Sequence, residues 1–191
     1  MADRETSAPR FGDPGGLAWI EAALDPDLIT GGTLGLMLDL PPSGTRGAEV
    51  PKILRPMMRG MSGVGKLMMR FGVKIQGQPL LLLVTTGAKT GIRRETVLGL
   101  FEDPGGEEAW LVVASNGGSA RHPGWAFNLA KDPADAWVDL GEGEFPVTAD
   151  LLSGDQRTDQ WNRVVDLAPG YGRYSEKTDR EIPIFKLARQ R

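Results

Sequence analysis

The sequence predicts an α+β domain built on a small antiparallel β-barrel that is covered by helices. Six short segments have the apolar runs or alternating pattern of β-strands, and most follow one another with only a turn between them. Helix-like segments with clear end signals lie between some of these strands. The 191 residues are 40% hydrophobic and 25% charged, the balance of a globular domain with a substantial core.

The N-terminal part of the chain carries no recognisable chemistry. We expect a mobile arm over residues 1–16, which are rich in proline, glycine and charge. Helix-like pieces follow over residues 17–24 and 34–40, and a Pro-Pro-Ser-Gly-Thr linker covers residues 41–45.

Residues 55–71 predict a helix in which methionines and leucines alternate with Arg and Lys. Such a stretch suits a membrane surface or the apolar entrance of a substrate site. Packing against the sheet is the simpler interpretation and the one that we favour.

Residues 80–84 predict the first strand, because five apolar residues bounded by proline and glycine are too few for a helix. The loop over residues 85–94 then combines two glycines, threonines and three cations. Backbone N–H groups, hydroxyls and fixed positive charge suit a phosphate or carboxylate ligand. A hairpin turn with solvated charges is the alternative, and the spacing alone slightly favours it. No phosphate-loop or dinucleotide-binding glycine pattern is present.

The second half of the chain alternates strands with two helices. A hairpin signature at residues 102–107 separates strands over 96–101 and 110–115, and a short helix begins at Pro123 and ends before Asp132. The remaining elements have period-two or helical spacing. They are strands over 136–140 and 145–151, a helix opened by a capping box at 153–156, and a last strand over 182–187.

Composition excludes several classes of function. The net charge of −3 and the absence of cysteine argue against a nucleic-acid binder, a disulfide framework and a thiolate metal site. A single histidine, His122, cannot form a multi-histidine metal site, and we expect it to shape a helix start. No secretory signal or long apolar span is visible, so a cytoplasmic location is expected.

Five motifs in order resemble the deazaflavin-dependent nitroreductase and quinone reductase family, whose members bind coenzyme F420 in a split β-barrel related to FMN-binding barrels. The motifs are Leu-Leu-x-Val-Thr-Thr-Gly-Ala-Lys-Thr-Gly over residues 81–91 with Arg94, Val-Ala-Ser-Asn-Gly-Gly over 113–118, His-Pro-x-Trp-x-x-Asn-Leu over 122–129, Pro-Gly-Tyr over 169–171 with Tyr174, and Arg-x-Ile-Pro over 180–183. The resemblance divides the chain into an N-terminal extension of unknown role, residues 1–54, and an F420-binding domain, residues 55–191.

The resemblance implies which residues contact the cofactor. The positions that match the anionic tail are Lys89, Thr90, Gly91 and Arg94, whereas Arg93 falls where the family varies. The positions that match the surroundings of the deazaflavin ring are Val113, Ala114, Ser115, Asn116, Trp125 and Asn128. A tryptophan in the core is the plain alternative for Trp125.

The implied reaction is transfer of a hydride from reduced F420 to an electrophilic acceptor such as a quinone or an activated nitro compound. Tyr171, Tyr174 and Ser115 are the expected proton donors or hydrogen-bonding groups, with Tyr171 the first choice. Ala168, Val97 and Gly99 replace larger residues of nitroimidazole-reducing members, so nitroimidazole reduction is not expected.

Two alternatives keep the fold and change the function. One is a non-catalytic carrier of F420 or an apolar ligand, and the other is an FMN-dependent oxidoreductase. Peripheral membrane contact through residues 55–71 is a further hypothesis. The sequence leaves the physiological acceptor, the oligomeric state and the role of residues 1–54 open; a lid, an oligomer contact and an unrelated appendage are all compatible with it.

Overall fold

The computed structural model describes residues 37–49, 62–105 and 108–191. Internal contacts divide the chain into one unit over Met1–Leu34 and another over Gly35–Arg191, and every described residue belongs to the second unit. Residues 37–49 are hydrogen-bonded to the rest of this second unit, whereas the sequence-based division assigns them to the N-terminal extension. The division at residue 54 stays a prediction.

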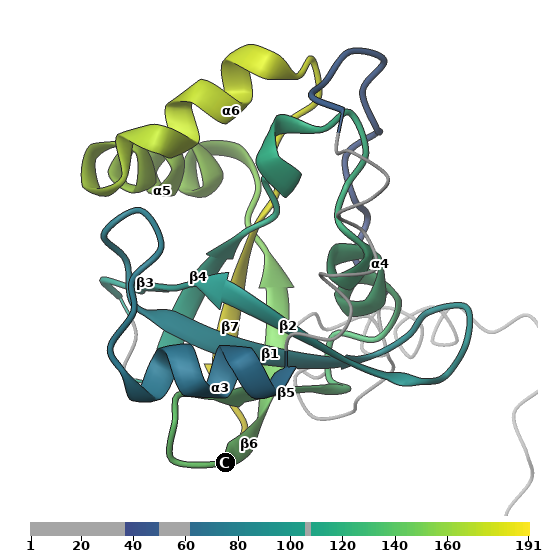
Figure 1. The fold of residues 1–191 in the computed structure, drawn as a ribbon. Helices are drawn as coiled ribbons and strands as arrows, with labels where there is room; N and C mark the ends of the chain where they lie inside the picture. The colour runs from purple at the N-terminus through teal and green to yellow at the C-terminus, as the bar shows by residue number, and fades with distance from the viewer. Residues whose placement is uncertain (1–36, 50–61, 106–107) are drawn as a thin grey trace, which may run out of the picture. The chain divides into compact units, whose positions relative to one another are not determined.

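The described residues of the second unit form a single curled antiparallel sheet of seven strands (Figure 1). The strands are β1 (Leu80–Thr86), β2 (Arg93–Gly99), β3 (Phe101–Glu102), β4 (Ala109–Val113), β5 (Ala136–Asp139), β6 (Glu144–Leu151) and β7 (Ile184–Arg189). Their order in the sheet is β2-β1-β5-β6-β7-β4-β3. All neighbours are antiparallel. The predicted antiparallel barrel with covering helices is confirmed.

Helices lie around this curled sheet, with α5 and α6 at the top of the view and α4 to the right (Figure 1). They are α3 (Ser62–Arg70), α4 (Gly124–Lys131), α5 (Gly154–Leu167) and α6 (Gly172–Lys177), with 3-10 turns η3 (Asn116–Gly118) and η4 (Pro169–Tyr171). Helix α3 packs on β1 and β2, α4 on β1, and α5 on β7. These contacts place α4 beside the turn that joins β1 to β2.

One predicted helix is present where the structure describes it, and another is wrong. The helix expected over residues 55–71 includes α3, but residues 55–61 lie outside the described residues. The helix expected over residues 34–40 is wrong where it can be checked, because residues 37–40 are not helical. Leu38 N–H instead donates to Ala130 O at 2.7 Å, and Pro41 disfavours helical backbone at the residue before it.

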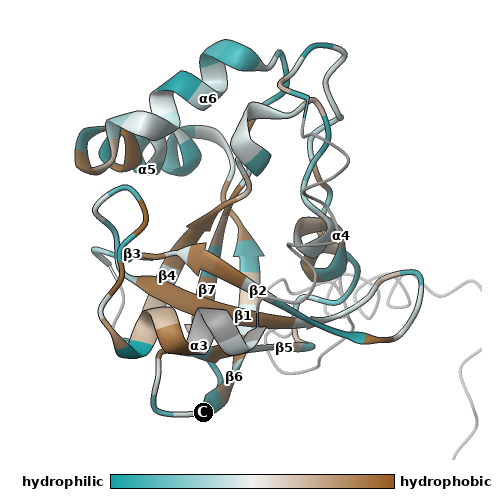
Figure 2. Cartoon of the chain, in the orientation of Figure 1, coloured by the Kyte–Doolittle hydropathy of each residue, from teal (hydrophilic) through white to brown (hydrophobic). Residues whose placement is uncertain are grey.

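The period-two pattern of the strands separates two apolar clusters. Val112 and Ala114 face the cluster that Trp125 of α4 closes, whereas Leu111 and Val113 face the cluster beneath α5 and η4. Strand β1 is buried along almost its whole length, as its uninterrupted apolar run predicts. Figure 2 shows hydrophobic ribbon along the strands and hydrophilic ribbon on α6.

Helix α5 begins where the sequence predicts, but the predicted capping box is wrong. Ser153 is the N-cap residue and its carbonyl accepts Arg157 N–H at 3.2 Å. The Ser153 side chain makes no capping hydrogen bond. Gly154 has φ of +54°, a left-handed conformation that glycine adopts readily, at the first residue of the helix.

Candidate active site

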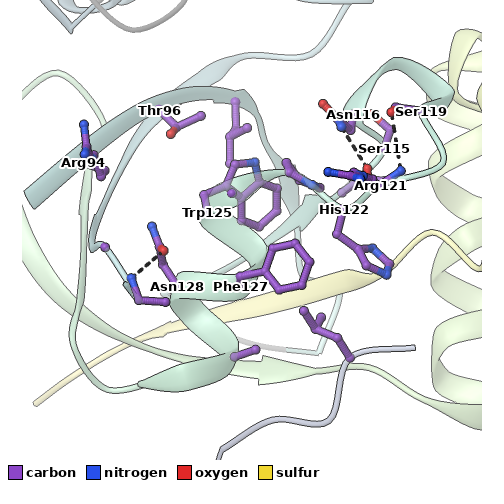
Figure 3. Close-up of a pocket in the computed structure, with 18 of the residues that line it drawn as sticks. Arg94, Thr96, Ser115, Asn116, Ser119, Arg121, His122, Trp125, Phe127 and Asn128 are labelled. Atoms are coloured by element: carbon purple, nitrogen blue, oxygen red, sulfur yellow. Dashed lines mark hydrogen bonds between the residues drawn. The ribbon is translucent and has the colours of Figure 1, made fainter. Parts of the chain in front are cut away.

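A large pocket opens at one end of the sheet and has a volume of about 1670 Å³. Six parts of the fold line it: residues 37–40, the turn residues Ile75 and Gln76, the β1–β2 hairpin, the segment from the end of β4 to Pro123, helix α4, and the tyrosines of η4 and α6. Figure 3 shows Arg94 and Thr96 on one side, Ser115 and Asn116 on the other, and Trp125 between them. The pocket exceeds the usual 300–1000 Å³ of small-molecule sites, so it suits a long ligand.

The cationic loop is the turn of the β1–β2 hairpin. Gly87 N–H donates to Ile92 O at 2.9 Å, and Gly91 N–H donates back to Gly87 O at 2.8 Å. A Cβ at Gly87 would lie 2.6 Å from Thr90 Oγ1, so this position needs glycine. Gly91 has φ of +64° and shapes the turn, but it does not line the pocket. The turn is therefore a hairpin and a pocket wall at once, so the two interpretations of this loop are compatible.

The cations of this turn differ in what they contact. Arg93 forms an ion pair with Glu144, and its guanidinium lies 4.8 Å from the centre of the Trp137 ring. All three cations line the pocket, but neither Lys89 nor Arg94 has an acidic partner among the described residues. Two uncompensated positive charges at one end of the pocket favour an anionic group there.

Helix α4 holds the turn in place through Ala88. Asn128 Oδ1 accepts Ala88 N–H at 2.9 Å, and Lys131 Nζ donates to Ala88 O at 2.7 Å. Asn128 Nδ2 also donates to Thr85 Oγ1 at 2.9 Å. Asn128 lines the pocket as predicted, and its amide also fixes the position of the turn.

The apolar wall of the pocket comes from α4 and the end of β4. Trp125 is only 7% exposed and its ring centre lies 5.5 Å from that of Phe185, so it is a core tryptophan with one edge on the pocket. Phe127 is 46% exposed and also lines the pocket. Val113 lines it too, whereas the fully buried Ala114 points into the core and does not.

A buried arginine organises the loop that follows β4. The Arg180 guanidinium donates to the carbonyls of Ala114, Ser115 and Ser119 at 2.8–3.0 Å. Ser115 and Asn116 therefore present their side chains at a loop whose backbone is fixed from behind. The hydroxyl of Ser115 lines the pocket with no hydrogen-bond partner among the described residues.

Residues 37–49 are held against the loop after β4 and the residues before β7 by several hydrogen bonds, and two groups of side-chain contacts stand out. His122 Nε2 lies 2.8 Å from Pro41 O, and the Asp179 carboxylate accepts the backbone N–H groups of Thr45 and Arg46 at 2.9 and 3.0 Å. The Thr45 hydroxyl also donates to Asp179 at 2.6 Å, and this hydrogen bond, with the Arg46 amide, lowers the pKa of the carboxyl. These contacts make residues 37–40 part of the pocket lining.

Two tyrosines form the end of the pocket away from the cations. The ring centres of Tyr171 and Tyr174 lie 5.6 Å apart in an edge-to-face arrangement. The Tyr174 hydroxyl accepts a hydrogen bond from Gln76 Nε2 at 2.9 Å, and the Tyr171 hydroxyl has no partner among the described residues. Burial, with a smaller effect of Tyr174, raises the pKa of Tyr171 to about 12, so this phenol stays protonated at neutral pH.

Most of the predicted site residues meet in this pocket, although Gly91 and Ala114 do not line it. Sequence reasoning missed Gln76, Lys131 and the residues 37–40, which carry no motif of their own. Arg180 stands in a matched motif, but nothing in that motif indicates that its guanidinium contacts four backbone carbonyls and the His122 ring. The described residues contain no group of three or more His, Cys, Asp or Glu side chains suited to a metal ion.

Comparison with known proteins identifies the family. The model for the F420H2-dependent quinone reductase family matches residues 61–188. The F420H2-dependent quinone reductase Rv1261c of Mycobacterium tuberculosis is 36% identical over 148 residues, which cover 75% of this chain and 93% of that protein. The chain belongs to the F420H2-dependent quinone reductase family.

Solved structures agree with this assignment. An F420-H2 dependent reductase, FDR-A, is 39% identical and superposes with a TM-score of 0.50, over 57% of this chain and 93% of that chain. A domain-swapped dimer is 34% identical with a TM-score of 0.51, over 69% and 98% of the two chains. As a member of the F420H2-dependent quinone reductase family, the chain is an oxidoreductase of the split-barrel fold, with reduced F420 as its cofactor and quinones as its class of acceptor.

Proposed function

We propose that the pocket binds reduced F420 along its length, with the anionic tail at the β1–β2 turn and the reactive ring beside the tyrosine end. The observation that carries this placement is a pair of cations, Lys89 and Arg94, which have no acidic partner in the described part of the chain and lie at one end of a pocket of about 1670 Å³. A long cofactor with a polyanionic tail and a flat ring fits a pocket that combines the cations of this turn with an apolar wall.

The turn holds the tail through two kinds of donor. Lys89 and Arg94 supply charge, and the hydroxyl of Thr90 supplies a neutral hydrogen bond. Lys131 and Asn128 take no part in this contact in our proposal, because both are already bonded to Ala88. Their task is to keep the turn from moving when the tail arrives.

The residues beside the ring exclude water and orient the reactants. Phe127, Val113 and the exposed edge of Trp125 form the apolar wall, and Ser115 and Asn116 offer polar groups at its margin. When bound, reduced F420 supplies a hydride. The dry wall protects the hydride from water and holds the acceptor at reacting distance.

The acceptor lies at the tyrosine end in this proposal. A quinone that gains a hydride develops negative charge on oxygen, and that charge needs a hydrogen-bond donor or a proton. The Tyr171 hydroxyl is a neutral donor because burial keeps the pKa of this phenol at about 12. A Cβ at Gly99 would lie 3.4 Å from the Tyr171 hydroxyl, so this end of β2 lies directly beside the phenol.

The test is a steady-state assay of the purified chain with reduced F420 and menadione. We expect saturable consumption of the reductant that depends on the quinone. A carrier would bind F420 without consuming it, which would contradict the proposed reaction. An FMN enzyme would bind FMN, and a parallel titration with FMN in place of F420 separates that alternative.

We also propose peripheral membrane contact through residues 55–71. Leu67 and Phe71 support it, because they are 54% and 75% exposed at the described end of this stretch. No helix in the described part of the chain is long and apolar enough to span a membrane. Co-sedimentation with anionic liposomes is expected, and a chain that stays in the supernatant would contradict this contact.

A further inference from the structure

Gln76 occupies a turn position that glutamine does not favour. Ile75 and Gln78 exchange two backbone hydrogen bonds of 2.9 and 3.0 Å, and the two residues between them, Gln76 and Gly77, have φ of +52° and +82°. Two positive φ angles define a type I′ turn, in which Asn, Asp and Gly are the preferred residues. A glutamine held in the left-handed region indicates that its side chain has a task.

That side chain is held in a single orientation at the tyrosine end of the pocket. Gln76 Nε2 donates to the Tyr174 hydroxyl at 2.9 Å, while Gln76 Oε1 is buried without a hydrogen-bond partner in the described structure. A Cβ at Gly170 would lie 1.9 Å from Oε1, so the amide fits only because residue 170 is glycine. The hydrogen bond from Gln76 to Tyr174 thus forms although the Gln76 backbone is strained and its amide oxygen lacks a partner in the described structure.

The hydrogen bond decides where the tyrosine proton points. A phenol carries one proton, and the amide N–H already occupies a lone pair of the Tyr174 oxygen. The Tyr174 proton is therefore left for a group other than Gln76, and Tyr174 lines the large pocket. A hydroxyl that accepts one hydrogen bond becomes a stronger donor in the next.

We propose that Gln76 is a positioning residue that fixes Tyr174 as the proton donor to the reduced quinone, an inference that rests on the proposed function. The quinone gains one hydride from reduced F420 and one proton from Tyr174, which gives a hydroquinone. The Tyr174 O–H bond breaks as the new O–H bond forms, and Tyr174 regains its proton from water. Tyr171, nearly buried and without a partner among the described residues, serves as the neutral second donor.

The variant that tests this proposal is Gln76→Asn. Asparagine suits a positive φ better than glutamine, so the turn should fold at least as well, but its shorter side chain cannot reach Tyr174. We expect kcat with menadione to fall about ten-fold, part of the 10²–10⁴-fold that a general acid contributes. The dissociation constant of F420 should stay within about two-fold, and the melting temperature should not fall.

Gln78→Asn is the matched control. Gln78 lies in the same turn and also donates through Nε2, but to Leu167 O at 3.3 Å, and it does not line the pocket. Its kcat should stay within about two-fold of the wild type. If Gln76→Asn and Gln78→Asn lose equal activity, the turn alone matters and the positioning role is wrong.

A double-mutant cycle with Tyr174→Phe completes the test. Because Gln76 acts through Tyr174, the double variant should be no slower than Tyr174→Phe alone. Independent, multiplying losses would overturn the proposal. A wild-type chain that binds F420 but does not reduce the quinone would remove the proposed function and this inference together, whereas an active wild type with an unaffected Gln76→Asn removes the inference alone.

Discussion

Arg93 and Arg94 are neighbours in the chain but have different partners in the fold. Arg93 is paired with Glu144 and lies over Trp137, whereas Arg94 has no acidic partner in the described part of the chain. Adjacent residues of a strand point to opposite faces, so their surroundings diverge at once. The resemblance selects Arg94 and leaves Arg93 out, and the contacts give a physical reason for that choice.

His122 is a buried imidazole whose tautomer is fixed by its neighbours. Arg180 lies 3.1 Å from Nδ1, and because a guanidinium only donates, Nδ1 accepts while Nε2–H donates to Pro41 O. Burial, and to a smaller extent the charge of Arg180, lowers the pKa of His122 below 6.5, although the hydrogen bond to Pro41 opposes this shift. The neutral imidazole is the form that links residues 37–49 to the loop after β4.

This lowered pKa predicts a loss of stability in mild acid. The unfolded chain takes up a proton at about pH 6.5 and the folded chain only at lower pH. The stabilisation is therefore complete above pH 6.5 and is lost as the pH falls from there through the lowered folded pKa. Urea unfolding between about pH 7.5 and about pH 5 should show a smaller fall in stability for His122→Gln than for the wild type.

The same titration can be observed directly. The chain has one histidine, so a single imidazole signal in the NMR spectrum reports its pKa without assignment. A value at or above 6.5 would contradict the buried, neutral state described above.

At the scale of elements, the β1–β2 turn depends on α4 for its position. Both polar groups of the Ala88 backbone are bonded to α4 side chains, the N–H to Asn128 and the carbonyl to Lys131. A hairpin turn with exposed cations would otherwise be free to move. The motif that supplies Asn128 thus builds the tail site from a distance of 40 residues along the chain.

Asn128→Ala should therefore weaken both the fold and cofactor binding. The change leaves Ala88 N–H and Thr85 Oγ1 without partners, which costs about 1–3 kcal/mol of unfolding free energy. We expect F420 affinity to fall about ten-fold, because about 1 kcal/mol or more of the binding free energy is then used to order the turn. Asn162→Ala, at an exposed position of α5, is the control for chemical denaturation and titration. Equal affinities in the two variants would show that the turn needs no support from α4.

Residues 37–49 show how a segment without a motif becomes part of a site. Leu38, Leu40 and their neighbours line the pocket because the segment is bonded to Ala130 at Leu38, to His122 at Pro41 and to Asp179 at Thr45. The contacts span more than 130 residues of sequence in the case of Asp179, so no local pattern indicates them. Sequence reasoning treated the segment as a helix and a linker for this reason.

For the molecule as a whole, the fold was predictable because each strand carries its own signal. Strand β1 is an uninterrupted apolar run because both of its faces are buried, and β6 alternates because only one of its faces is buried. The glycines mark the turns. The sheet order is not local: β7 pairs with β4 and β6, and only the complete fold brings those strands together. The structure has one strand more than the six that the sequence predicts, and this additional strand, β3, has only two residues and is too short to predict.

The candidate site was predictable where side chains stand in motifs, and not where contacts alone define their task. Lys89, Arg94 and Tyr171 were named from motifs and line the pocket. Gln76 was not named, because its importance lies in a positive φ and in one hydrogen bond to a residue 98 positions away. Such features arise from packing and have no signature in a single sequence.

The central claim is that the cations of the β1–β2 turn anchor F420 in this pocket, and a fluorescence titration of F420 tests it most directly. We expect the wild type to bind F420 saturably, and Lys89→Ala with Arg94→Ala to weaken binding about 100-fold, since each charge-assisted hydrogen bond contributes about 1.5–3 kcal/mol.

Arg93→Ala is the matched control for this titration. It removes the same charge from the same turn, but this charge is paired with Glu144 and lies over Trp137, so its affinity should stay within about three-fold of the wild type. An affinity of the double variant within about two-fold of the wild type would contradict the placement of the tail. Binding of FMN in place of F420 would contradict the assignment of the cofactor itself.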